Sequence, residues 1–240
     1  MNIPALLILG LPLLCLAFIV LAAIVLASKS MGESNRKKEV WPKFAEMIGG
    51  ALTEGAAGQR DTIAARLGED PFYLDTYVYG ANHAVLNCTR MRVFYRALNP
   101  IELVVCSREM QAEAQINPKL HEVDSALVGL TRDFAVFSAA IDQASLLLGA
   151  EQSQLIEAAK PIDLRIRRRQ NWKNQGVSNS IYEVHLQKYG VVTELPELMA
   201  MFHLISTCLR KLHEARLAGR MVDDTRTATD YFNTDGINAV

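Results

Sequence analysis

The chain begins with a long run of apolar residues. No charged side chain occurs from Ile3 to Ala27. A helix of about 20 apolar residues crosses the roughly 30 Å hydrocarbon core of a bilayer, and this run is longer. A cleaved signal peptide would instead have a basic start, a shorter apolar core and small residues at a cleavage site. The pattern therefore predicts an uncleaved transmembrane anchor over residues 1–28.

Beyond residue 70, apolar and polar positions alternate in several segments, which is typical of strands with one buried face. In one of them Met91 and Val93 fall on the buried face, whereas Arg90 and Arg92 fall on the face that we expect to be exposed. The short links between these segments favour an antiparallel meander, followed by a hairpin formed by the last two. The predicted strands are Phe72–Gly80, Ala84–Arg96, Ile101–Ser107, Arg132–Ala139, 162–169 and 181–190.

Other segments repeat their apolar residues with the period of a helix. The segment Glu39–Thr53 predicts a short helix, and Ile141–Ala159 predicts one or two more. The clearest pattern lies in Leu195–Ala218, where Pro196 suits the first turn and Gly219 follows the end. Its apolar stripe predicts an amphipathic helix that packs across the sheet. The stripe consists of Leu198, Phe202, Ile205, Leu209 and Leu212.

These patterns together predict an α+β fold. A single N-terminal transmembrane helix would precede an antiparallel-sheet domain with short helices and a long C-terminal amphipathic helix. The predicted divisions are an anchor over residues 1–28, a basic juxtamembrane linker over 29–38, the α+β domain over 39–219 and a polar tail over 220–240.

Charge and cysteine usage predict the location. The basic residues Lys29, Arg36, Lys37 and Lys38 follow the apolar run, and such residues stay on the cytoplasmic side of a membrane. The cysteines beyond residue 28 are three, far apart and without a CxxC pair, as expected for free thiols in a reducing compartment. We therefore expect a bacterial inner-membrane protein with its N-terminus outside and its C-terminal domain in the cytoplasm.

The arginine-rich strands are the main candidate contact surface. The formal net charge is -1, so general affinity for nucleic acid is not expected. Local basic patches can still meet anionic lipid, an acidic partner or only water, and the sequence leaves these three alternatives open. The candidate contact residues are Lys29, Arg36, Lys37, Lys38, Trp41, Arg90, Arg92, Arg165, Arg167, Arg169 and Trp172.

The sequence carries no catalytic signature. It contains no HExxH, GxSxG, Walker A or GxGxxG motif, and its five histidines form no close pair of metal ligands. We therefore expect no enzyme activity, no cofactor and no metal site.

Two stretches resemble the central pattern of a family of uncharacterised bacterial membrane-anchored proteins. They are "NCTRMRVFYRALNPIELVVCSR" and "GLTRDFAVFSAAIDQASLLL", and the resemblance extends from Asn87 to Leu212. The chain departs from the pattern at Cys88, where a tyrosine is expected, and before Asp142, where Lys-Gly-Asn is expected. The resemblance implies the architecture above and no catalytic residue. The matching residues are Thr89, Arg90, Met91, Arg132, Asp133, Phe134 and Asp142.

An anchor, a compact domain and the lack of catalytic motifs together favour a non-catalytic role. The leading hypothesis is an accessory, scaffolding or stabilising subunit of a larger membrane protein complex, such as a photosynthetic, respiratory or transport complex. Its partners would be an integral membrane complex and membrane lipids. The alternative is a membrane-tethered regulatory domain that binds anionic lipid or a small ligand through its arginine-rich sheet face.

Overall fold

The computed structural model describes most of the domain beyond residue 34. The described residues are 18, 20, 21, 32, 35–55, 60–81, 84–112, 114, 116–168 and 180–219.

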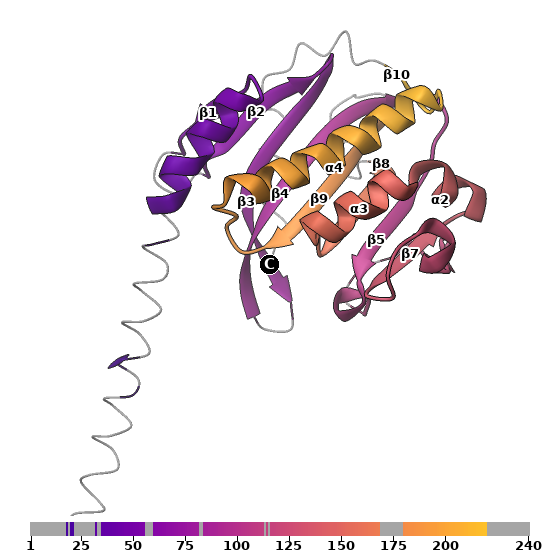
Figure 1. The fold of residues 1–240 in the computed structure, drawn as a ribbon, viewed down its shortest axis with the longest axis horizontal. Coiled ribbons are helices and arrows are strands. Elements are labelled where there is room, and N and C mark those ends of the chain that lie inside the picture. Colours follow the sequence, from indigo (N-terminus) through magenta and orange to yellow (C-terminus); the bar gives the residue numbers. More distant parts are fainter. Residues whose placement is uncertain are drawn as a thin grey trace, which may run out of the picture.

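The described residues form one large antiparallel sheet of ten strands (Figure 1). Nine strands follow the order β1-β2-β3-β4-β9-β8-β5-β7-β6, and β10 pairs with β4 beyond the start of β3. Gly68, with φ at +64°, lies in the tight turn between β2 and β3, where a side chain would be strained. The strands are β1 (Ala51–Thr53), β2 (Thr62–Leu67), β3 (Asp70–Ala81), β4 (Ala84–Ala97), β5 (Leu103–Ser107), β6 (His121–Val123), β7 (Phe134–Ser138), β8 (Asp163–Arg168), β9 (Ile181–Tyr189) and β10 (Ala218–Gly219).

One apolar row crosses the sheet from β1 to β6 and explains why these strands align. Each of its members lies directly opposite the next across the ladders. A register slip of one residue would move a whole strand's apolar set to the other face, so the row fixes the register. Its members are Leu52, Ile63, Leu74, Met91, Leu186, Leu164, Val105, Val136 and Val123.

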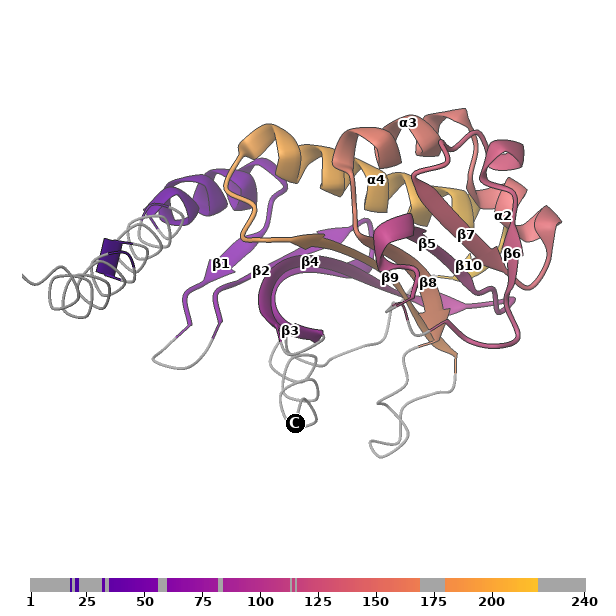
Figure 2. The same ribbon diagram turned by 90° about the horizontal axis from the view of Figure 1, so that it is seen from below.

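The helices cover this apolar face (Figure 2). They are α2 (Ile141–Leu147), α3 (Ala150–Ala159), α4 (Leu195–Glu214) and the helix over residues 35–47, and short 3-10 turns occupy Arg108–Met110 and Ser125–Val128. Leu198, Leu204 and Leu212 of α4 are fully buried. Full burial of such a side chain contributes about 1.5–3 kcal/mol.

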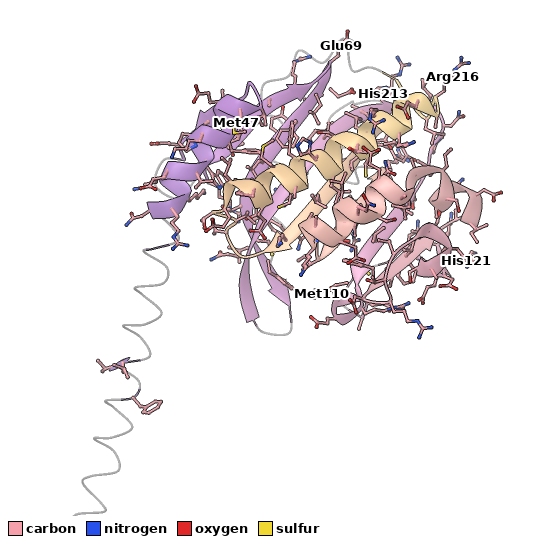
Figure 3. The ribbon with its side chains drawn as sticks, in the orientation of Figure 1. Met47, Glu69, Met110, His121, His213 and Arg216 are labelled. Carbon is pink, nitrogen blue, oxygen red and sulfur yellow. The ribbon has the colours of Figure 1, made fainter. Side chains whose placement is uncertain are left out.

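Both ends of α4 are fixed to other elements. Near its start, the Phe202 ring makes edge-on contacts with Phe44 at 5.9 Å and Phe72 at 5.3 Å between ring centroids. Near its end, His213 Nε2 lies 2.7 Å from Asp70 Oδ2 at the start of β3. Figure 3 shows His213 on α4 beside the turn that carries Glu69. These contacts orient the helix across the strands.

The structure corrects the predicted fold class. The described part of the chain is a ten-stranded antiparallel sheet with helices, and it includes no helix that is both long and apolar enough to span a bilayer. The predicted anchor over residues 1–28 lies outside the described residues, except for Phe18, Val20 and Leu21. The predictions of a transmembrane, single-pass protein are therefore not supported.

The strand order and one helix also differ from expectation. β4 is followed in the sheet by β9, not by β5, because the β8–β9 hairpin is inserted between them. Alternation predicts which face a residue takes but not which strand lies beside it. The first helix begins by residue 35, inside the predicted linker, and β1 occupies the end of the segment that was predicted to be helical.

Candidate binding site on the polar face of the sheet

The sheet face opposite the helices carries a cluster of charged and polar side chains. Strand register places them in rows, since residues directly opposite each other point to the same side. One row is Asp75, Arg90, Gln187 and Asp163, and the next contains Arg92, His185 and Arg165. Arg167 lies opposite Glu183 in a third row. We call this set the polar face: Asp75, Arg90, Arg92, Asp163, Arg165, Arg167, Glu183, His185 and Gln187.

Arg90 and Arg92 are buried, so the prediction that they are exposed is wrong. Their exposed fractions are 8% and 2%. Arg90 donates to both carboxylate oxygens of Asp75 at 2.9 and 2.7 Å, and Arg92 Nη2 donates to Asp75 Oδ2 at 3.2 Å. Burial opposes ionisation of Asp75, but the two guanidinium groups outweigh it and lower the pKa of this carboxyl. A buried charge requires such pairing.

The β8 arginines form two further ion pairs on the same face. Arg165 Nε donates to Asp163 Oδ2 at 2.6 Å, and Arg167 Nε donates to Glu183 Oε1 at 2.8 Å. Burial raises the pKa of Asp163 even though Arg165 favours its ionised form.

His185 lies between Arg92 and Arg165 and is neutral. Arg167 Nη2 lies 3.1 Å from His185 Nδ1, and a guanidinium group can only donate, so Nδ1 accepts and the proton lies on Nε2. Burial, followed by the positive charge of Arg167, lowers the pKa of His185 well below its usual value. Within the described residues the buried Nε2 has no hydrogen-bond partner. A buried donor of this kind costs about 1–3 kcal/mol until an acceptor reaches it.

The polar face has more positive than negative groups. Within the polar face, four arginines accompany three carboxyl groups. Guanidinium groups and a neutral imidazole N–H all donate hydrogen bonds, and carboxylates accept them. The arrangement is therefore suited to a ligand that brings an anionic acceptor.

The described thiols are poor nucleophiles. Burial raises the pKa of Cys88 and of Cys106 to about 11, and that of Cys208 to about 12. At neutral pH these thiols are protonated, and only a thiolate attacks readily. In the residues that the structure describes, no group of three or more His, Cys, Asp or Glu side chains could hold a metal ion.

The other predicted contact residues lie elsewhere. Trp41 is 1% exposed, and its Nε1 donates to the Val192 carbonyl at 3.1 Å, so it packs inside the domain rather than at a surface. On the same helix Arg36 pairs with Glu194, Lys37 pairs with Asp61, and Lys38 is exposed. Lys29, Arg169 and Trp172 lie outside the described residues.

Sequence reasoning missed the acidic and imidazole members of the polar face. Glu183, His185 and Gln187 alternate with buried apolar residues in β9, in the same way as Arg165 and Arg167 do in β8. That alternation was visible, but we expected an exposed face that meets lipid, a partner or water. Asp75 was a further signal, because a single acid within an aromatic strand usually has a partner when it is buried.

Comparison with known proteins does not identify a family. No protein-family model matches the chain, and no curated protein matches it. One similar solved structure is the crystal structure of the mycobacterial trehalose monomycolate transport factor A, TtfA. The similarity has a TM-score of 0.48 and 7% sequence identity, and it covers 78% of this chain and 96% of that chain. A likeness at this level indicates neither a family nor a function.

Proposed function

We propose that this chain is a non-catalytic accessory subunit that supports a larger protein assembly by binding an acidic segment of a partner at the polar face. The observation that carries the proposal is the composition of that face. Four guanidinium groups and the His185 Nε2 donor meet three carboxyl groups on neighbouring strands. A partner carboxylate would form charge-assisted hydrogen bonds there, which are about twice as strong as neutral ones.

Burial of the polar face favours a peptide segment over a bilayer surface. Arg90 and Arg92 are almost fully buried in the middle of β4, whereas basic residues that attract anionic lipid act from an exposed surface beside the headgroups. An extended segment with one or two carboxylates can instead contact the half-buried Arg165 and Arg167 of the same face. The membrane complex as partner and the inner-membrane location stay predictions.

Photo-crosslinking from position 77 tests this proposal. Tyr77 lies opposite Cys88, and the Arg90 guanidinium stacks over its ring at 4.7 Å. Replacing Tyr77 with benzoylphenylalanine therefore puts an aromatic crosslinker at the border of the polar face. In gentle extracts we expect it to crosslink to an acidic segment of another protein. A crosslinker at Gln154, exposed on α3, is the matched control and should not capture that segment.

A synthetic peptide of the captured segment completes the test. Full-length protein should bind it, and Arg165→Glu should weaken binding about tenfold, because one charge-assisted contact is lost and a repulsive charge is added. The proposal fails if positions 77 and 154 capture the same proteins. It also fails if the captured segment is not acidic, or if Arg165→Glu leaves its affinity unchanged.

A further inference from the structure

We propose that the acidic C-terminal segment of this chain, residues 220–240, binds the polar face in cis and that an acidic partner segment replaces it. This inference rests on the proposed function, because it concerns the same site. It adds a regulatory step in which the chain's own segment competes with the partner for the guanidinium groups and the His185 donor.

The first argument is the burial of the polar face. The described helices lie on the other side of the sheet (Figure 2), so they do not account for the burial of Arg92, Glu183 and His185, whose exposed fractions are 2%, 3% and 6%. Charged side chains are rarely buried to this extent unless acceptors and donors reach all of their polar atoms. His185 Nε2 still needs an acceptor within the described part of the chain.

The second argument is the place where the described chain ends. β10 pairs antiparallel with β4, with Ala218 opposite Ala97 and Gly219 opposite Arg96. Gly219, the last described residue, therefore lies opposite Arg96, and Arg92 lies four residues from Arg96 on the same face of β4. At about 3.3 Å per residue that distance is roughly 13 Å. The segment 220–240 spans on the order of 70 Å when extended, so it can reach every residue of the polar face.

The third argument is charge complementarity. The segment holds Asp223, Asp224, Asp230 and Asp235 against Arg220 and Arg226, so it is acidic where the polar face has an excess of guanidinium groups. An aspartate carboxylate is also the kind of acceptor that His185 Nε2 lacks. A tethered ligand acts at an effective concentration of about millimolar, so even weak binding in cis would lower the apparent affinity for a partner.

The purified full-length chain tests the cis contact. With benzoylphenylalanine at Tyr77, we expect intramolecular crosslinks to peptides from residues 220–240. The control crosslinker at Gln154 should give none. In a variant with the four aspartates changed to asparagine, the yield should fall about tenfold, and 1 M salt should lower it as well. Crosslinks to any other segment, or an unchanged yield in the asparagine variant, would overturn the inference.

The same variants distinguish this inference from the proposed function. If the segment binds in cis and the partner also binds, the four-asparagine variant should capture the partner segment more efficiently than the unmodified chain. Partner crosslinks without cis crosslinks would overturn the inference and leave the proposed function in place. Cis crosslinks without any acidic partner would overturn the proposed function instead.

Discussion

Arg167 donates to His185 Nδ1 at 3.1 Å, and this contact fixes the imidazole as the neutral tautomer with its proton on Nε2. Arg167 thus determines that His185 presents an Nε2–H donor to a ligand. The same relationship links the polar face to pH, because a proton added to Nδ1 would break the contact and bring a fifth positive charge among four guanidinium groups.

The depressed pKa of His185 predicts loss of stability in mild acid. The unfolded chain takes up this proton near pH 6.5, whereas the folded chain does not. Unfolding is therefore favoured as the pH falls below about 6.5, by up to about 1.4 kcal/mol per pH unit for this group, and the effect vanishes above pH 7. Urea unfolding at pH 7.5 and 5.5 measures it. His185→Gln should remove this part of the slope, and an equal slope in both proteins would contradict the assignment.

Asp75→Asn should strongly destabilise the fold. It removes the carboxylate that Arg90 and Arg92 share, and breaking a buried ion pair from one side costs about 3–5 kcal/mol. Glu214→Gln is the matched control, since the Arg210–Glu214 pair is half exposed and such surface pairs contribute little to stability. Denaturant midpoints compare the two, and similar losses would show that the polar face is more hydrated than the structure indicates.

Trp41→Phe should destabilise the domain. The indole is buried and donates to the Val192 carbonyl, so its loss leaves an unsatisfied acceptor and a small cavity, at about 1–3 kcal/mol. Lys38→Ala on the exposed side of the same helix should change stability by less than about 0.5 kcal/mol. Thermal unfolding of both variants checks this, and a larger loss from Lys38→Ala would reverse the assignment.

The thiols of Cys88, Cys106 and Cys208 should resist modification in the folded protein. All three are buried, and their pKa values are raised to about 11–12. In a Cys15→Ser background, a thiol reagent at pH 8 should react slowly in buffer and rapidly in urea. Fast reaction of one thiol in the native state would show that its strand or helix opens locally.

The sequence pattern predicted which side of each strand is buried, but it did not predict which strands lie beside each other in the sheet. Met91 and Val93 were correctly predicted to be buried, because period-two alternation reports which side of a strand is apolar. The same alternation predicted that Arg92 is exposed, because the pattern of one strand does not show that Asp75 and His185 lie on the adjoining strands. Pairing between Arg92 and His185 joins residues 93 positions apart, and no local pattern carries that information.

The central position of β4 also determines when this domain can form. β4 pairs with β3 locally, but β9 and β10, its other described neighbours, are synthesised much later. Sheets with such distant pairings fold slowly, because the entropy cost of closing a long loop comes before the stabilising contacts between the strands form. During synthesis the β3–β4 hairpin would therefore form before β9 exists. Until then, one edge of β4 would be unpaired, and Arg90 and Arg92 would be exposed to solvent. Chaperone protection of this hairpin is an expected requirement of the nascent chain rather than of the mature protein.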